Sequence, residues 1–308
     1  MKIVVLDGYT ENPGDLSWAG LEALGEVTVY DRTAYQESPL IAERIGDAEI
    51  VVMNKTPISK ETIDKCPNIK LIAVLATGYN VVDYNYAKEK GIPVCNVPTY
   101  GTASVSQFSI ALLLEICHHI GHHSESVHAG NWANNADWCY WDYPLIELEG
   151  KTIGIIGFGT IGRLVAERLQ VFGAKILVSD PFVPAEAVTA AGCEPVSKEE
   201  LLRRSDFVTL HGRIGAGDPP IIGEQELREM KPTAVLVNTA RAVLVDMEAL
   251  YTALKEHWIM GAAVDVFPME PLPKETTAES KVEHETRDSA TPIQTVQLMP
   301  EGYDYTMP

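Results

Sequence analysis

The sequence predicts an α/β protein made of two doubly wound parallel-sheet domains, and three observations lead to this prediction. Its 308 residues are about twice the length of a typical domain. Short runs rich in β-branched residues alternate with amphipathic stretches, and this alternation stops and then restarts near residue 150. A glycine-rich segment also stands between a strand-like run and a helical one. We therefore expect one domain at residues 1–99 and a second at 100–273.

In the first domain, the strand-like runs are continuously apolar. Such runs, separated by helices, are typical of parallel strands that are covered on both faces. The predicted strands are 2–6, 26–30, 49–53, 69–75 and 92–96, and the predicted helices are 15–24, 40–45, 59–66 and 83–90.

The second domain begins with a long apolar stretch at 103–120, which predicts a helix, and a loop rich in Asn, Trp and Tyr follows at about 124–148. The alternation of strands and helices then restarts. From residue 274 it stops, and the composition of 274–308 predicts a tail of irregular structure. The predicted strands are 151–156, 175–179, 207–210, 235–237 and 261–266, and the predicted helices are 161–172, 199–204, 224–230 and 247–257.

Composition and charge narrow the function classes. The chain is 46% apolar and carries a formal net charge of −19, which repels phosphate backbones and anionic lipid. We therefore expect neither a nucleic-acid partner nor a membrane partner. The apolar start of the chain is too short for a signal peptide, and Glu115 interrupts the most apolar helix. Five scattered cysteines without a CxxC pair predict a reducing cytoplasmic location, with the thiols as core residues rather than nucleophiles.

The motif Gly157-Phe158-Gly159-Thr160-Ile161-Gly162 follows a predicted strand and opens a predicted helix, as in a dinucleotide-binding unit. The glycines allow a tight turn, a close approach of the pyrophosphate and close packing of the helix. Asp180 ends the next predicted strand, where it accepts hydrogen bonds from the adenosine ribose and repels a 2′-phosphate, which favours NAD over NADP. The alternative is a glycine-rich turn without a ligand. The predicted cofactor-binding residues of this motif are Gly157, Gly159, Thr160, Ile161, Gly162 and Asp180.

Beyond this motif, the chain resembles the D-isomer-specific 2-hydroxyacid dehydrogenases, and most of all their branch of glycerate dehydrogenases and hydroxypyruvate reductases. The resemblance covers about residues 1–273. It rests on ordered matches at 75–83 (LATGYNVVD), 96–102 (NVPTYGT), 149–152 (EGKT), 237–241 (VNTAR) and 264–271 (VDVFPMEP).

The resemblance implies a flavodoxin-like substrate domain followed by a Rossmann NAD-binding domain, in an enzyme that moves a hydride between NAD and a small 2-oxo or D-2-hydroxy acid. The expected substrate pair is either hydroxypyruvate/D-glycerate or glyoxylate/glycolate. It also implies a homodimer. The residues matched by position are Ala76, Thr77 and Gly78 for the substrate carboxylate, Arg241 for the carboxylate and the 2-oxygen, Glu270 as the partner of a catalytic His, and Thr239, Ala240, Arg241 and Asp265 for the cofactor.

The C-terminal part departs from the family. A Pro-His pair is expected soon after Glu270, and its His exchanges the proton of the substrate hydroxyl. Here the only later histidine is His284, which lacks a preceding proline, and 290–293 (ATPI) echoes the motif without a His. The family's closing helix is also not recognisable. The open alternatives are therefore a dinucleotide-binding protein with impaired or no catalysis, a substitute role for His284, and a C-terminus altered relative to a competent parent.

Two further departures from the family and two clusters of residues concern the second domain. Arg213 stands where the family has a proline beside the cofactor, and Ala242 replaces a glycine, which matters if that residue needs a positive φ. The histidines of 118–123 (HHIGHH) have the spacing of helical zinc ligands, but no carboxylate or cysteine fits, so we expect no metal. The aromatic loop after them is expected either at the substrate mouth and subunit interface, by resemblance, or in plain packing.

Overall fold

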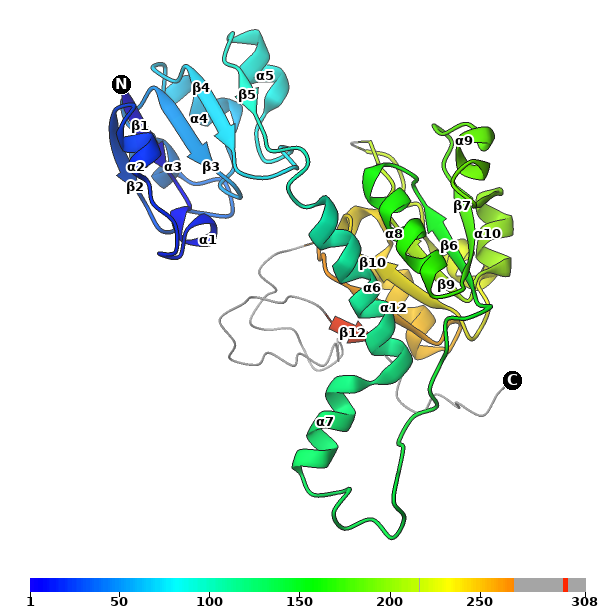
Figure 1. Ribbon diagram of the computed structural model, residues 1–308. Helices are drawn as coiled ribbons and strands as arrows, with labels where there is room; N and C mark the ends of the chain where they lie inside the picture. Colours follow the sequence, from blue (N-terminus) through cyan, green and yellow to red (C-terminus); the bar gives the residue numbers. More distant parts are fainter. Residues whose placement is uncertain (216, 269–295, 299–308) are drawn as a thin grey trace. The chain divides into compact units, whose positions relative to one another are not determined.

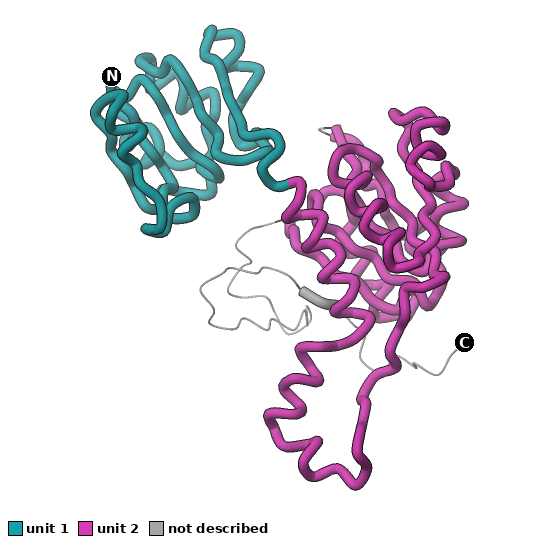
Figure 2. The backbone as a smooth tube through the Cα atoms, in the orientation of Figure 1, with its two compact units in different colours: residues 1–101 teal, residues 102–308 magenta. Residues whose placement is uncertain are grey.

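The computed structural model describes residues 1–215, 217–268 and 296–298, and the chain divides into two compact units, Met1–Gly101 and Thr102–Pro308 (Figure 2). Each unit is built on its own sheet of mostly parallel strands with helices on its faces (Figure 1). The predicted fold class is therefore confirmed.

Unit 1 contains a five-stranded parallel sheet in the order β2-β1-β3-β4-β5. This is the flavodoxin-like strand order, in which ligands bind at the carboxyl ends of the strands. Apolar side chains cover both faces of the sheet, with Val4, Val51 and Ile72 on one face and Ile3, Val5 and Val52 on the other. The elements are β1 (Lys2–Val5), α1 (Gly8–Glu11), α2 (Ala19–Glu22), β2 (Glu26–Val29), α3 (Pro39–Ile45), β3 (Ile50–Met53), α4 (Lys60–Lys65), β4 (Leu71–Val74), α5 (Tyr84–Glu89) and β5 (Val94–Cys95).

Unit 2 contains a seven-stranded sheet in the order β12-β11-β10-β9-β6-β7-β8. From β8 to β11 the strands are parallel and follow the Rossmann order, with the reversal of strand order between β6 and β9. The strands are β6 (Thr152–Ile156), β7 (Lys175–Ser179), β8 (Glu194–Pro195), β9 (Phe207–Leu210), β10 (Val235–Asn238), β11 (Gly261–Val264) and β12 (Val296–Leu298).

Helices cover both faces of this sheet (Figure 1). Successive strand residues point to opposite faces, so Ile155 packs with α6 and α8 while Val208 packs with α10, α11 and α12. The two resulting cores fix the strand ends at which the predicted cofactor residues lie. The helices are α6 (Thr102–His118), α7 (Ile120–His128), α8 (Thr160–Val171), α9 (Ala185–Thr189), α10 (Lys198–Arg204), α11 (Glu224–Glu229) and α12 (Met247–Lys255), with a 3-10 turn at Ala242–Leu244.

Local patterning missed several short elements. Strand β12 lies inside 274–308, where we expected irregular structure, and it pairs antiparallel with β11. The helix predicted at 15–24 is only α2, because Asn12 holds the preceding segment in a turn by hydrogen bonds with Gly14 and Leu16. Short elements of this kind depend on neighbours that sequence periodicity does not reveal.

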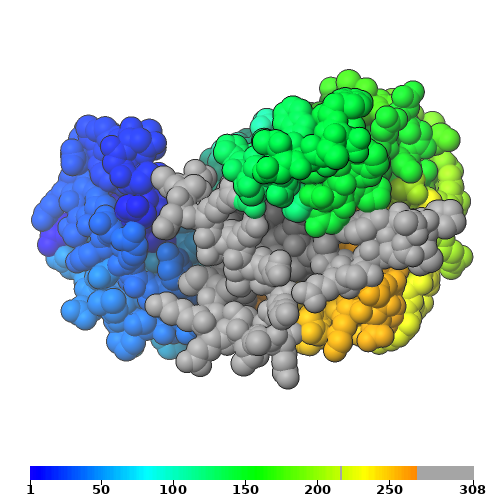
Figure 3. Space-filling model, turned by 90° about the horizontal axis from the view of Figure 1, so that it is seen from below, coloured from blue at the N-terminus to red at the C-terminus, as the bar shows by residue number. Residues whose placement is uncertain are grey.

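The segment after α6 differs most from the sequence prediction. We expected one helix to residue 120 and a loop from about 124, but His119 has a φ of 47° and ends α6, and α7 then continues to His128. Together, α7 and the following loop to residue 148 project away from the sheet of unit 2 as an arm (Figure 1). Seen from below, this arm stands toward the viewer (Figure 3). We call residues 119–148 the arm.

In the part of the chain that the structure describes, no single helix is long and apolar enough to cross a membrane. Only α6 and α7 taken together, with a bend of 55°, meet that criterion. The apolar side chains of α6, such as Leu113 and Ile116, are buried in the core of unit 2.

Candidate functional site

The carboxyl ends of β6, β7, β9, β10 and β11 lie at one edge of the unit 2 sheet, because these strands are parallel. The predicted cofactor residues all follow these strand ends in the chain. The sequence therefore brings together Gly157–Gly162, Asp180, Thr239–Arg241 and Asp265 at this edge, while Glu270 and His284 lie outside the described residues.

The glycine loop is built as a dinucleotide site requires. Gly157 has a φ of 94°, and a Cβ there would lie 2.3 Å from the backbone nitrogen of Gly212. A Cβ on Gly162 would lie 2.2 Å from the carbonyl oxygen of Gly157, so only glycine lets α8 start this close to the loop. A Cβ on Gly159, by contrast, would meet nothing within 4 Å. The loop is therefore closed toward the protein and open on the side of Gly159.

Helix α8 starts directly after Gly159, which is its N-cap. The first helical hydrogen bond in the loop runs from Arg163 N–H to the carbonyl of Gly159. The N–H groups before Arg163 thus have no partner within the helix and point out of its N-terminus, where they and the helix dipole favour an anion. The open space at Gly159 and these N–H groups fit the pyrophosphate of a dinucleotide.

Asp180 follows β7 and faces the glycine loop. Its Oδ2 accepts a hydrogen bond from the Phe158 N–H at 2.6 Å, and its Oδ1 accepts one from the Phe182 N–H at 2.8 Å. The carboxylate is therefore held at the edge of the loop, at the place where an adenosine ribose is bound in Rossmann sites. Phe182, which the sequence analysis did not single out, is 87% exposed beside it.

The turn after β10 carries Arg241. Asn238 is fully buried at the end of the strand, and the side chain of Thr239 lies 2.7 Å, oxygen to oxygen, from Ser109 on α6. The Arg241 side chain is exposed, and its Nη1 donates to the Ala240 carbonyl at 2.8 Å. An exposed guanidinium at this edge is available to a carboxylate ligand. The backbone N–H of Asp265, after β11, donates to the carbonyl of Asn238.

Ala242, at which the sequence left the backbone conformation open, opens the 3-10 turn after Arg241. Among the non-glycine residues that the structure describes, only His119 and His257 have a positive φ. The Cβ of Ala242 therefore causes no strain of the left-handed kind.

His211 and Gly212 follow β9 and pack against Gly157. Burial lowers the pKa of His211 to about 4, so its imidazole is neutral near neutral pH, and its Nε2 lies 3.0 Å from Thr209 Oγ1. Arg213, which stands where the family has a proline, has an exposed side chain.

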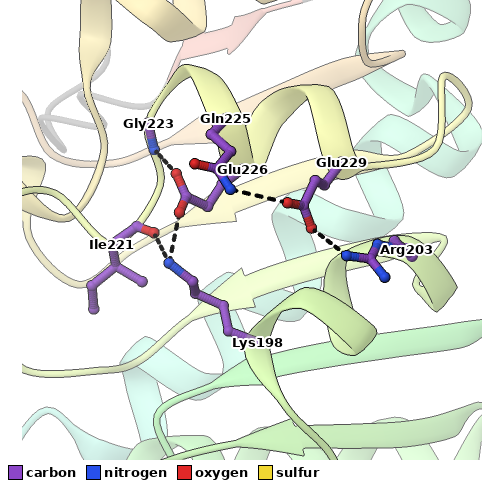
Figure 4. Close-up of polar contacts among 7 residues, drawn as sticks. All are labelled: Lys198, Arg203, Ile221, Gly223, Gln225, Glu226 and Glu229. Atoms are coloured by element: carbon purple, nitrogen blue, oxygen red, sulfur yellow. Dashed lines mark hydrogen bonds and ion pairs between the residues drawn. The ribbon is translucent and has the colours of Figure 1, made fainter.

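A polar network fixes the end of the segment that leads from His211 to α11 (Figure 4). Lys198 on α10 donates to the Ile221 carbonyl at 3.3 Å and to Glu226 at 2.7 Å, and Glu226 also accepts from the Gly223 N–H at 3.0 Å. Arg203 pairs with Glu229 in the same way one turn further along both helices. The network links α10 and α11 and holds Ile221 and Gly223, which directly precede α11.

In unit 1, the predicted substrate turn follows β4. The carbonyl of Ala76 accepts from the Val97 N–H at 3.0 Å, Thr77 Oγ1 donates to the Val97 carbonyl at 3.0 Å, and Asn96 donates to the Thr77 carbonyl at 2.8 Å. These contacts use the oxygen atoms of the turn. The backbone N–H groups of Thr77 and Gly78 have no hydrogen bond among the described residues, so they remain available to an anion.

Sequence reasoning missed a buried aspartate in unit 1 that binds the backbone of a neighbouring strand end. Asp7 is buried after β1, and its carboxylate accepts hydrogen bonds from the backbone N–H groups of Asn54, Lys55 and Thr56 at 2.7 to 3.1 Å. These residues follow β3, the neighbour of β4 in the sheet. An aspartate directly after an apolar strand is the signal that was available in the sequence.

Neither the cysteines nor the histidines form a metal centre in the part of the chain that the structure describes, where no group of three or more His, Cys, Asp or Glu side chains is placed to hold an ion. All five cysteines are free thiols, and all lie within the described ranges. In the arm, His119 stacks on Tyr143 at 4.2 Å between ring centroids, and His122 Nε2 lies 2.7 Å from Asp142. The histidines thus hold the arm together.

The sequence is similar to a known family of dehydrogenases and to individual members of it. Residues 110–286 match the model of the NAD-binding domain of D-isomer-specific 2-hydroxyacid dehydrogenases. The chain is 52% identical over 272 residues to a hydroxypyruvate reductase of Blautia hydrogenotrophica, covering 88% of this chain and 84% of the relative. It is 40% identical over 231 residues to a glycerate dehydrogenase of Methylorubrum extorquens, covering 75% of this chain and 71% of the relative.

The fold is also similar to that of solved structures. One of them is the D-lactate dehydrogenase of Aquifex aeolicus in complex with NAD and lactic acid, with a TM-score of 0.69 and 28% identity. The match covers 87% of this chain and 77% of that chain.

Proposed function

Because the chain belongs to the D-isomer-specific 2-hydroxyacid dehydrogenase family, we propose that it is a hydroxypyruvate reductase that forms D-glycerate. The family assignment makes it an NAD-dependent oxidoreductase of small 2-oxo and 2-hydroxy acids. The choice of hydroxypyruvate over glyoxylate is the finer step, and it is supported by the names of the two relatives at 52% and 40% identity.

One observation of the structure supports the proposal above all others. The open glycine loop, the carboxylate of Asp180 and the exposed guanidinium of Arg241 follow parallel strands that end at the same edge of the unit 2 sheet. The same rigid sheet therefore positions the residues that would bind a dinucleotide and the arginine that would bind an anionic substrate.

The residues of the chain would act as follows. Bound NADH supplies the hydride. Gly157, Gly159, Thr160, Ile161 and Gly162 receive the pyrophosphate, and Asp180 receives the ribose hydroxyls. The backbone N–H groups of Thr77 and Gly78 bind the substrate carboxylate, and Arg241 binds the carboxylate and the 2-oxygen with its parallel donors.

The remaining assignments follow the family pattern. We propose that the backbone of Thr239 and Ala240, together with Asp265, contacts the nicotinamide half of the cofactor. Glu270 is the proposed partner of the proton donor, and both it and His284, the one histidine that follows it, lie outside the described residues.

We further propose that the protein is a cytoplasmic homodimer. The five free thiols support the reducing compartment. The exposed apolar side chains of the arm support the dimer, because monomers rarely expose so many together. They are Ile120, Val127, Trp132, Trp138, Trp141 and Leu145.

The test measures NADH oxidation with hydroxypyruvate, glyoxylate and pyruvate, and in parallel the binding of NADH and NADPH by fluorescence. We expect kcat/KM for hydroxypyruvate to exceed that for the other two acids by about tenfold or more, a margin of about 1.4 kcal/mol. A preference for glyoxylate would contradict the choice of substrate. Binding of NADH without turnover of any acid would instead support a dinucleotide-binding protein without catalysis.

A further inference from the structure

The side chain of Asn238 spans the turn that carries Arg241. Its Oδ1 accepts a hydrogen bond from the Ala240 N–H at 3.1 Å, and its Nδ2 donates to the carbonyl of Arg241 at 2.9 Å. One carboxamide thus fixes two peptide groups, the one before Ala240 and the one after Arg241. The residue is 0% exposed, so neither bond is shared with solvent.

The same residue is anchored to the sheet on its other side. Asn238 is the last residue of β10, in register with Leu210 of β9 and Val264 of β11. Its carbonyl accepts the N–H of Asp265 at 3.0 Å. The start of the turn is therefore held in place by three strands, β9, β10 and β11. The carboxamide of Asn238 connects the backbone of Arg241 to this fixed point.

Asparagine has properties here that similar side chains lack. Aspartate would place a second acceptor against the Arg241 carbonyl, whereas an apolar side chain would leave that carbonyl and the Ala240 N–H without these partners. Thr239, next to it, bonds Ser109 on α6 and restrains the opposite side of the turn. Among the described residues, the Arg241 guanidinium bonds only the Ala240 carbonyl. Its side chain is otherwise exposed, so its direction depends on the backbone of the turn.

We propose that Asn238 is a positioning residue that aims Arg241 at the substrate. This inference rests on the proposed role of Arg241 in binding the 2-oxo acid. When the carboxamide is removed, the turn gains freedom, and a displacement of the guanidinium by about 1 Å is enough to lower the rate by about 10²-fold.

The test compares Asn238→Ala in two backgrounds, the unmodified chain and Arg241→Ala. In the unmodified chain we expect kcat/KM for hydroxypyruvate to fall by about 10- to 100-fold, and to fall by more than the affinity for NADH does. In the Arg241→Ala background we expect Asn238→Ala to change kcat/KM by less than about twofold, because the group through which it acts is gone. A residue with a merely structural role would lower both backgrounds alike.

Two variants and a stability measurement complete the design. Asn238→Ser keeps an oxygen that can accept the Ala240 N–H, and it should give an intermediate kcat/KM and stand in for Asn238→Ala should that variant not fold. Gln170→Ala is the matched control, since that amide also bonds two backbone carbonyls of unit 2, those of Ala191 and Gly192, away from the site. Thermal melting of each variant separates folding from activity.

The outcomes are distinguishable. Unchanged kcat/KM in Asn238→Ala, or an equal loss in both backgrounds, would overturn the inference while leaving the proposed function intact. Absence of turnover in the unmodified chain would overturn the proposed function and, with it, the inference.

Discussion

The carboxylate of Asp180 accepts a hydrogen bond from the backbone N–H of Phe158, with 2.6 Å between oxygen and nitrogen. This bond joins the end of β7 to the glycine loop after β6. Because the other carboxylate oxygen is held by Phe182, the charge is fixed in place rather than free to turn away. The same group therefore shapes the loop and is the one that we propose selects the dinucleotide.

Asp180→Ala should lower the preference for NADH over NADPH. Removing the carboxylate takes away the acceptor for the ribose hydroxyls and the charge that repels a 2′-phosphate, so we expect the ratio of kcat/KM values, NADH to NADPH, to fall by about tenfold or more. Steady-state kinetics with both cofactors measure the ratio. Asp47→Asn, at an exposed ion pair with Lys2 in unit 1, is the control. A ratio equal to that of the unmodified chain would remove Asp180 from cofactor selection.

Arg241→Lys should fail to replace arginine despite keeping the charge. Lysine is a point charge, whereas the guanidinium offers two parallel donors to a carboxylate, so we expect kcat/KM for the 2-oxo acid to fall by about 10²-fold. The affinity for NADH should stay within about threefold. Kinetics and fluorescence titration give the two values, and Arg203→Lys, at an exposed pair with Glu229, serves as control. Near-normal kcat/KM in Arg241→Lys would mean that charge alone suffices.

The sequence predicted the strands and the glycine loop well because both depend on local signals. The apolar runs before Gly157 and Asp180 have the length of buried strands, and the spacing of the glycines reports the turn directly. It failed where structure depends on contacts between distant residues. The start of α7 depends on the left-handed backbone of His119, and β12 forms only by pairing with β11.

The candidate site shows the same division. Asp180 stands out in the sequence because it is a charged residue at the end of a predicted strand, whereas Arg241 was identified through its match to the family pattern. Asn238 and Asp7 are equally placed, each directly at or after a strand end, but their importance lies in hydrogen bonds to backbone groups that only the folded chain brings near. A search for Asn and Asp at strand ends would have found both.

The cysteines should react in an order set by burial. Burial raises the pKa of Cys117 to about 12 and also raises the pKa values of Cys66 and Cys193, whereas Cys95 is exposed. Because the thiolate is the reactive form, we expect a disulfide reagent to modify Cys95 first and the three buried thiols only on unfolding. Mass spectrometry after timed labelling measures the order. Cys95→Ser should lose the fast phase, and early labelling of Cys117 would contradict the structure of α6.

Replacing two tryptophans of the arm should dissociate the proposed dimer. Trp138 is 86% exposed and Trp141 is 69% exposed, and burial of each against a second copy would contribute about 2 kcal/mol or more. The double substitution Trp138→Ser, Trp141→Ser should therefore shift the mass in solution from dimer toward monomer, measured by light scattering. Val171→Ser is the matched control, because Val171 is 85% exposed on α8 outside the arm. A dimer that survives the double substitution would place the interface elsewhere.

Acid should destabilise the protein partly through His211. Burial lowers its folded-state pKa to about 4, below the unfolded value near 6.5, so between these values the unfolded chain binds more protons than the folded one. Its stabilising contribution is therefore complete above about pH 6.5 and is lost as the pH falls toward 4, by at most about 3 kcal/mol.

Urea denaturation at pH 7 and pH 4.5, followed by tryptophan fluorescence, measures this loss. His211→Asn is the matched comparison, because it removes the titrating group while leaving every carboxylate in place. Its free energy of unfolding should fall less between the two pH values than that of the unmodified chain, by about 2 to 3 kcal/mol. Equal losses in the two proteins would show that His211 is solvated or paired as a cation in the folded state, and the packing of His211-Gly212 against Gly157 would then need revision.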